Sequence, residues 1–315
     1  MPPADPAAVS PVSTGDRSGV FSAVAAFAMW GAFPAYFLLL RPAGAFEIVD
    51  WRVLFSVGFC AIAITVMRKW PALVAIVRQP RQLFMLALAA VLIFINWEVY
   101  VVAVLAGHVV ETALGYFINP IVTVLLGVLL LRERLRVAQW VAVGISAIAV
   151  LILAIGYGSF PWIALTLAFS FGLYGLVKKQ VGPQVDALSG LTIETGWLIP
   201  VAAVQLVFVQ LDTGITFGTV SVGHGLLLLS AGVVTAIPLL SFAAAARRLP
   251  LVYMGLIQYL TPVLQFAFGA FVLHEAMPAE RWLGFGLVWL ALIVLSIDLL
   301  VTARARPRRA SALPA

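Results

Sequence analysis

The chain has 315 residues, of which 63% are apolar and only 10% are charged, and its formal net charge is +6. This composition excludes a soluble globular protein, and the single Cys60 excludes a disulfide framework or a thiolate metal site within one chain. Apolar runs of about 20 residues, the length that crosses a hydrocarbon core of roughly 30 Å, recur along the whole chain. They predict ten membrane spans, at 18–40, 47–66, 82–104, 111–131, 138–155, 160–177, 188–210, 223–246, 251–273 and 281–301.

The first apolar run is too long for a cleaved signal sequence, so we expect it to be retained as a span. Outside the spans we expect a disordered cytoplasmic N-terminus at 1–17, polar loops at 67–81 and 211–222, and a basic cytoplasmic tail at 302–315. None of these segments is long enough for a soluble domain.

The basic residues fall in alternate connections between the predicted spans. Lys and Arg are enriched in the cytoplasmic loops of membrane proteins, so this alternation indicates an orientation. Only Arg41 and Arg281 fall on the opposite face. We therefore expect a multi-pass protein of the cell membrane with both termini in the cytoplasm. The basic tail would then contact anionic membrane lipid, and we expect no nucleic-acid partner.

The sequence repeats itself at an offset of 142 residues: Leu131–Glu133 returns as Leu273–Glu275, and Pro120 returns as Pro262. Five spans in each copy is an odd number, so the second copy must enter the membrane from the opposite face. The sequence thus predicts an all-α integral membrane protein whose ten transmembrane helices form two inverted five-helix repeats. Many secondary transporters are built this way, with the substrate site between the halves.

Several stretches carry a resemblance to a known family. They are Glu111–Pro120 (Glu-Thr-Ala-Leu-Gly-Tyr-Phe-Ile-Asn-Pro), Gly127–Glu133 with Gln139-Trp140, Trp30–Tyr36 and Phe160–Lys178. Over nearly its whole length the chain resembles the EamA family of the drug/metabolite transporter superfamily, and in particular its RarD subgroup. The resemblance implies ten helices, EamA repeats at 18–155 and 156–301, and transport, often export, of small metabolites.

Ionisable residues within spans are the main candidates for a site, because a charge at mid-bilayer costs roughly 2.5–3.5 kcal/mol on insertion scales. Arg52 and Glu98 lie at similar depth near the outer face and are expected to be close. Arg52 would bind a substrate carboxylate or phosphate, with Glu98 as competitor or proton carrier; a static salt bridge, or Arg52 reaching the outer surface, is the alternative. Glu194, the repeat equivalent of Arg52, would be a lone carboxylate that exchanges protons with the cytoplasm, or one that stays protonated against a neighbouring helix. Asp50 is expected at the membrane interface.

Pro120 and Pro262 are expected to kink the fourth and ninth spans, to line a cavity and to act as hinges during transport; a fixed kink is the alternative. Each would free the carbonyl four residues earlier, and each follows a polar residue. The freed carbonyls would be those of Tyr116 and Gln258, and the preceding polar residues are Asn119 and Thr261. At similar depth, Trp97 beside Asn96 would wall a pocket for a planar or amphipathic solute, unless it belongs to the interfacial aromatic belt. Glu133 and Glu275 are expected to be structural, closing the turns between paired helices.

The function predicted from these features is secondary transport. The chain would export or exchange a small organic metabolite or amphipathic drug across the cytoplasmic membrane by alternating access, with the substrate site at the interface of the two repeats. The sequence contains no phosphate loop, no His-Glu-x-x-His and no Gly-x-Ser-x-Gly, so we expect no enzyme, no cofactor and no metal. A non-transporting membrane scaffold and, after it, an intramembrane enzyme are the alternatives. Small residues on the fifth and tenth spans leave a homodimer open.

Overall fold

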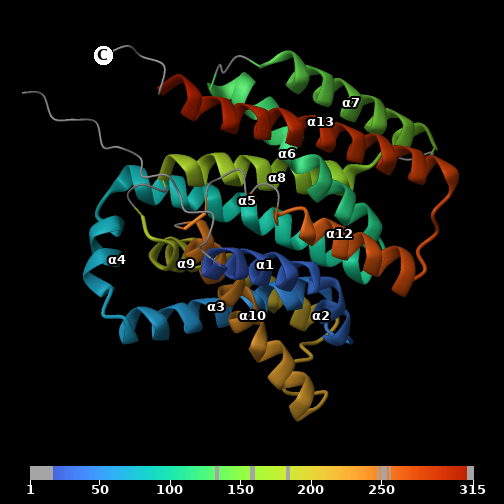
Figure 1. Ribbon diagram of the computed structural model, residues 1–315. Helices are drawn as coiled ribbons and strands as arrows, with labels where there is room; N and C mark the ends of the chain where they lie inside the picture. Colours follow the sequence, from blue (N-terminus) through green and yellow to red (C-terminus); the bar gives the residue numbers. More distant parts are fainter. Residues whose placement is uncertain are drawn as a thin grey trace, which may run out of the picture.

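The computed structural model describes residues 17–131, 135–156, 160–181, 185–246, 248–249, 254 and 257–310 (Figure 1). Regular structure in these ranges is helical, and they contain no strand. The helices are α1 (Arg17–Gly31), α2 (Phe33–Leu39), α3 (Ala45–Val66), α4 (Trp70–Val77), α5 (Pro80–Leu105), α6 (Val109–Leu131), α7 (Val137–Gly156), α8 (Trp162–Val181), α9 (Ala187–Asp212), α10 (Val222–Ala246), α12 (Leu260–Ala267), the π-helix η1 (Phe268–Val272) and α13 (Ala279–Ala310).

Six helices within the described part of the chain are long and apolar enough to cross a membrane: α3, α5, α6, α9, α10 and α13. The pair α1 and α2 gives a seventh if the two are one span bent by 44°. Three shorter apolar helical segments complete the set, at Val137–Leu153, Trp162–Lys178 and Leu260–Val272. Every predicted span therefore contains an apolar helix or helical segment, while the count of ten crossings stays a prediction.

The break between α1 and α2 follows from the Trp30–Pro34 sequence. Pro34 has no N–H to donate to the carbonyl of Trp30, four residues earlier, which removes one helical hydrogen bond at the bend. The side chain of Gln265 in α12 donates to this Trp30 carbonyl instead, at 3.2 Å. Gly31 lies beside the same helix, where a Cβ atom would stand 2.7 Å from the side chain of Leu264. The bend is therefore stabilised by close packing against α12.

Two connections differ from the prediction. The expected loop at 67–81 contains α4, whose apolar residues Trp70, Val74 and Val77 are exposed. The basic residues that flank α4 lower the local hydropathy, so the sequence did not predict this short helix. Amphipathic helices of this kind can lie at a membrane surface. At the other end of the chain, α13 continues to Ala310, beyond the predicted end of the tenth span. The predicted disordered segment at 1–17 lies, except for Arg17, outside the described residues.

In the ninth predicted span, of which residues 254 and 257–273 are described, a helix begins at Leu260 after turn residues at 258 and 259. Pro262 lies in the first turn of α12, where a missing N–H costs little. The Gln258 carbonyl accepts a hydrogen bond from the Thr261 N–H at 3.2 Å, so the proline does not leave that carbonyl unpaired. Pro120, in contrast, lies inside α6, which runs through it without a break.

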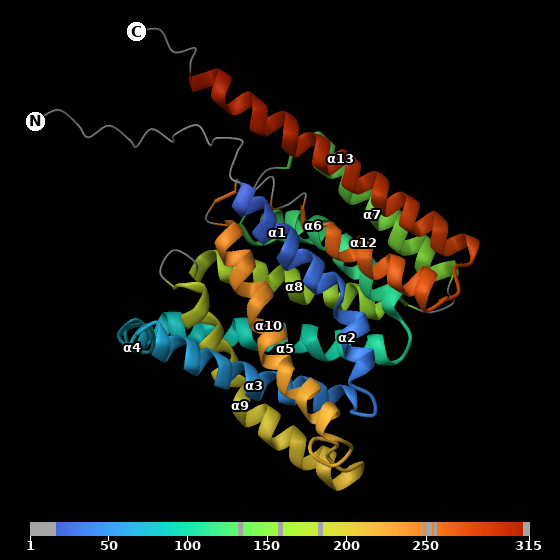
Figure 2. The ribbon, with the colours of Figure 1, turned by 60° about the horizontal axis from the view of Figure 1, so that its bottom comes forward.

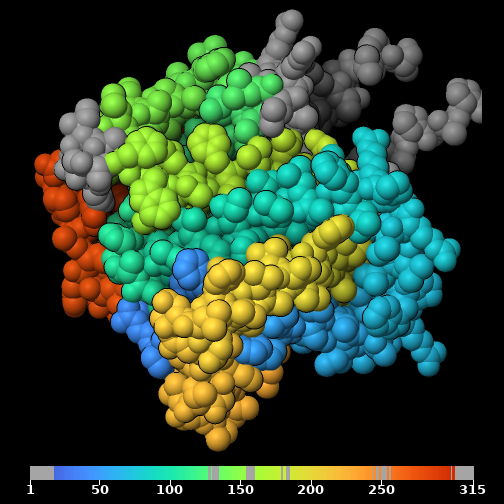
Figure 3. Space-filling view, turned by 180° about the vertical axis from the view of Figure 1, so that it is seen from behind, coloured from blue at the N-terminus to red at the C-terminus, as the bar shows by residue number. Residues whose placement is uncertain are grey.

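Helices distant in sequence pack side by side. Helices α7 and α13 lie against each other along one edge of the molecule, while α3 contacts α5, α9 and α10 (Figures 1 and 2). The pair α1 and α10 also packs closely, as does the pair α5 and α8. Seen from behind, the C-terminal end of α9 and its connection to α10 protrude from the bundle (Figure 3). Both halves of the chain thus contribute to one helical core.

The helix limits repeat at the offset found in the sequence. Helices α9, α10 and α13 begin at 187, 222 and 279, which are 142 residues after the starts of α3, α5 and α7 at 45, 80 and 137. The contacts correspond as well, since α1 packs against α10 and α12 whereas α8 packs against α5 and α6. Equivalent helices therefore have equivalent neighbours.

Candidate substrate and coupling site

Arg52 lies on α3 in the middle of the helical core and is only 4% exposed. Its Nε donates to Thr235 Oγ1 on α10 at 2.7 Å. Its Cζ stands 4.1 Å from the ring centroid of Trp97 on α5, and 5.3 and 5.6 Å from those of two phenylalanines on α2, Phe33 and Phe37. A guanidinium on an aromatic face is attracted by the ring quadrupole. Four segments of the chain therefore hold this one cation.

No carboxylate of the described residues lies within ion-pairing distance of Arg52. The expected closeness of Arg52 and Glu98 does not produce a salt bridge, because adjacent residues on α5 point in different directions: Trp97 toward Arg52, and Glu98 toward α9. Arg52 also does not reach the outer surface. Among the described residues, the contacts of this buried cation are a hydroxyl group and aromatic rings.

Tyrosine and amide side chains extend this environment. Tyr116 donates to Asn96 Oδ1 at 3.0 Å, and Asn96 in turn donates to Ser170 Oγ at 3.0 Å on α8. Tyr100 accepts a hydrogen bond from Gln265 at 2.9 Å. We refer to the following residues as the Arg52 cluster: Phe33, Tyr36, Phe37, Arg52, Asn96, Trp97, Tyr100, Tyr116, Thr235 and Gln265. The structure thus brings Asn96, Trp97 and Tyr116, which the sequence indicated separately from Arg52, together with that residue.

Glu98 and Asp50 form a second group, next in sequence to Trp97 and near Arg52. With its amide nitrogen turned toward them, Gln205 on α9 donates to Asp50 Oδ1 at 2.9 Å and to Glu98 Oε1 at 3.2 Å. Asp50 is fully buried within the protein, while its expected depth at the membrane interface stays a prediction.

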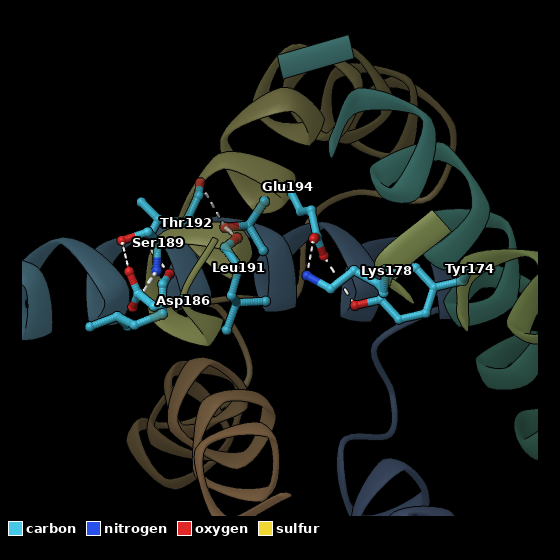
Figure 4. Close-up of polar contacts among 9 residues, drawn as sticks. Tyr174, Lys178, Asp186, Ser189, Leu191, Thr192 and Glu194 are labelled. Carbon is cyan, nitrogen blue, oxygen red and sulfur yellow. Dashed lines mark hydrogen bonds and ion pairs between the residues drawn. The ribbon is translucent and has the colours of Figure 1, made fainter. Parts of the chain in front are cut away.

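Glu194 is not a lone carboxylate. Lys178 Nζ lies 2.6 Å from Glu194 Oε1, and the Tyr174 hydroxyl donates to Oε2 at 3.1 Å (Figure 4). Glu194 is almost completely buried, and both partners come from α8. The sequence placed Lys178 in a cytoplasmic loop, because the predicted sixth span ended at 177 whereas α8 continues to Val181. The repeat offset did indicate that Lys178 belongs to a span, because its equivalent, Tyr36, lies within the predicted span 18–40.

The residues before the two prolines make equivalent contacts. Asn119 Nδ2 donates to the Ala168 carbonyl of α8 at 3.0 Å, and Thr261 Oγ1 donates to the Phe27 carbonyl of α1 at 2.7 Å. Each side chain binds the backbone of the helix that its own helix packs against. Neither residue reaches Arg52 by a hydrogen bond, and within the described residues the side chain of Gln258, just before α12, makes no hydrogen bond to the cluster.

Two further carboxylates have structural roles. Glu275 accepts hydrogen bonds from the amides of Val109 at 2.6 Å and Val110 at 2.9 Å, so it caps α6 rather than closing the turn between its own helices. Glu47 accepts bonds from the amides of Thr216 and Phe217 and fixes the segment between α9 and α10. Glu133 lies outside the described residues. In the part of the chain that is described, no three His, Cys, Asp or Glu residues are placed to hold a metal ion.

Comparison with known proteins identifies the family. Residues 17–155 match the EamA-like transporter family. Protein RarD of Streptomyces exfoliatus is 48% identical, covering 95% of this chain and 94% of its own. The chain belongs to the RarD group of the EamA-like transporter family. An uncharacterized transporter of Bacillus subtilis, YojE, is 42% identical over 90% of this chain and 94% of its own.

The fold also has a counterpart among solved structures. One crystal structure covers 90% of this chain and 98% of its own, with a TM-score of 0.57 and 16% sequence identity. At that identity the likeness shows the fold alone. Together with the apolar helices, the family makes this chain a multi-pass membrane protein of the drug/metabolite transporter superfamily.

Proposed function

We propose that the chain is a secondary transporter that exports or exchanges a small organic solute, and that the solute binds at the Arg52 cluster. One observation carries this proposal: a buried guanidinium with no carboxylate partner among the described residues. Buried charges are normally paired, so an unpaired one in a membrane span is expected to meet its counter-ion in a ligand. The partner chemistry is a carboxylate or phosphate.

The aromatic surroundings narrow the solute further. Trp97, Phe33 and Phe37 surround the guanidinium. The rings of Tyr36 and Tyr100 contact Phe37, and that of Tyr116 contacts Tyr100. These aromatic side chains favour an organic anion with a planar or apolar body over a small inorganic anion. The amide of Asn96 and the amide oxygen of Gln265, which is buried without a donor, would orient the polar groups of that body.

Alternating access is supported by the internal repeat. The common offset of helix starts and the matching helix contacts favour two inverted EamA repeats, at 18–155 and 156–301, related by a pseudo-two-fold axis in the membrane plane. In such an arrangement the halves exchange conformations, and a site at their interface opens to one face at a time. Arg52 fits this position, since Thr235 comes from the second repeat and Trp97 from the first. We assign both termini to the cytoplasm.

Coupling and gating roles complete the proposal. Pro120 would let α6 bend during the exchange of conformations, and Pro262 would do the same at the start of α12. Glu194 would act through its ion pair with Lys178, which joins two helices of the second repeat and would break or form as the cytoplasmic side opens.

Solute counterflow in proteoliposomes tests the substrate site. A panel of labelled organic anions, their neutral amides and amphipathic cations is compared for the unaltered protein, Arg52→Gln, Arg52→Lys and the exposed control Arg78→Gln. A hydrogen bond to a charged group contributes about 1.5–3 kcal/mol, so Arg52→Gln should slow exchange of the anion about 10- to 100-fold. Arg52→Lys should restore part of it, and Arg78→Gln should have no effect. Full anion exchange by correctly folded Arg52→Gln would contradict the site.

A further inference from the structure

Three helices bring two carboxyl groups onto one amide inside the membrane-spanning region. Asp50 comes from α3, Glu98 from α5 and Gln205 from α9. Gln205 donates to one oxygen of each carboxyl group, at 2.9 and 3.2 Å. Because both oxygens contact the same nitrogen atom, the two carboxyl groups are immediate neighbours. We refer to Asp50 and Glu98 as the carboxyl pair and to Gln205 as its bridge.

The second oxygen of each carboxyl group has no donor. Asp50 Oδ2 and Glu98 Oε2 are both buried, and neither finds a hydrogen-bond partner within the described residues. Asp50 itself is completely inaccessible. No Lys or Arg of the described part of the chain lies within ion-pairing distance of either group. A buried carboxylate oxygen without a donor lacks the interaction that would hold its negative charge.

Other charged and titratable groups on the surrounding helices have their own partners or lie exposed at a helix end. On α3, Glu47 is bound to the segment after α9, and Arg52 is directed to Thr235 and Trp97. On α9, Glu194 is paired with Lys178. The exposed Asp212 ends α9, and His224 on α10 contacts the Leu40 carbonyl at 2.9 Å. None of these neighbours supplies a cation to the carboxyl pair.

We propose that the carboxyl pair is a proton-binding site, in which Asp50 and Glu98 share a proton on the Gln205 bridge. Two adjacent carboxylates in a low-dielectric interior repel each other strongly, and one proton removes that repulsion. Gln205 suits both states of the pair. Its nitrogen donates to an ionised carboxylate, and after rotation its oxygen accepts from a protonated one. The proton leaves as water reaches the pair when α3, α5 and α9 separate.

The site is positioned to couple proton binding to the Arg52 cluster. Asp50 lies two residues before Arg52 on α3, and Glu98 directly follows Trp97 on α5. Loss of the proton therefore adds a negative charge on the two helices that also carry Arg52 and Trp97. The coupling rests on the function proposed above, whereas proton binding by the pair does not.

Infrared spectroscopy of the purified protein tests proton binding without a substrate. The unaltered protein should show a protonated-carboxyl C=O stretch at neutral pH that disappears in alkali. Asp50→Asn/Glu98→Gln should lack that part of the band, while the control Asp212→Asn, at an exposed carboxylate, should keep it. An identical band in the double variant would overturn the proposal. If the double variant does not fold, the two single variants give the same comparison, since each removes one carboxyl group.

Proteoliposomes then test the coupling. The measurement is the ratio of solute uptake driven by a pH gradient to solute exchange without one. The ratio should fall to unity in the double variant and stay unchanged in Asp212→Asn. An unchanged ratio in the double variant would overturn the coupling. If no solute is transported by any variant, the proposed function fails while the infrared result still decides whether the pair binds a proton.

Discussion

The ion pair between Lys178 and Glu194 gives the most direct test of the described contacts. Replacing Lys178 by methionine leaves the carboxylate of Glu194 buried, with only the Tyr174 hydroxyl bound to it. Breaking a buried pair in this way costs roughly 3–5 kcal/mol of unfolding free energy. The Lys178 side chain is 29% exposed and that of Glu194 only 2%, so solvent screens part of the interaction. We expect the lower end of the range, about 3 kcal/mol.

The reverse change is expected to cost less. In Glu194→Gln the ammonium of Lys178 can turn toward water, because it is partly exposed already, and the new amide still accepts from Tyr174. We expect a loss of about 1 kcal/mol. In Lys178→Met/Glu194→Gln neither charge remains, and replacement of a buried pair by neutral groups is often close to neutral. The double variant should therefore be more stable than Lys178→Met alone.

Equilibrium unfolding in mixed detergent micelles, followed by tryptophan fluorescence, measures all four proteins. The coupling energy of the cycle should be at least about 2 kcal/mol. The pair Lys69 and Asp186, in which each side chain is 33% exposed, provides the matched control and should give about 1 kcal/mol or less. Additive effects in the Lys178 cycle, within about 0.5 kcal/mol, would refute the ion pair and the burial from which its magnitude is derived.

Three other outcomes follow from close packing, capping and titration. Gly232→Ala places a Cβ against the backbone of Phe55 in α3 and should destabilise the protein by about 1–3 kcal/mol in thermal unfolding. Gly196→Ala, with open space around it, should not destabilise it. Equal effects of the two changes would contradict the contact between α3 and α10. Glu275→Gln weakens the cap of α6 by about 1 kcal/mol and should speed amide exchange at its first turn; unchanged exchange there would contradict the cap. Burial alone would raise the pKa of Asp186, but hydrogen bonds from its partners outweigh it and hold that pKa below its usual range. Its contribution is therefore complete above about pH 4 and lost as the pH falls through the lowered pKa, so Asp186→Asn should destabilise at neutral pH and lose this effect in acid; a penalty that persists in acid would contradict the sign.

Hydropathy predicted the helices well because burial in lipid is a local requirement of the chain. The predicted span 188–210 became α9 at Ala187–Asp212, and 138–155 became α7 at Val137–Gly156. Short helical segments next to the spans were missed because the prediction relied on local hydropathy. The flanking charges of α4 lowered its local hydropathy, and Lys178 ended the predicted sixth span one turn before the helix ends.

The site was only partly predictable. Arg52 could be singled out from sequence because a charge within an apolar run is costly wherever the chain folds. Its hydrogen-bond partner, Thr235, is 183 residues away, and no local pattern distinguishes that threonine from others. Gln205 was equally hidden, because a single glutamine in an apolar helix is unremarkable until two carboxyl groups face it. Pairing depends on which helices pack together, and that is decided by the whole core.

The cap on α6 has a consequence for biosynthesis. Glu275 follows Val109 by 166 residues, so the ribosome completes α6 long before the carboxylate that caps it exists. At roughly 5–20 residues per second, this interval lasts about 10–30 s. During that time the first amides of α6 must be satisfied by lipid headgroups, water or the insertion machinery. The final fit of the first half therefore waits until translation has passed residue 275.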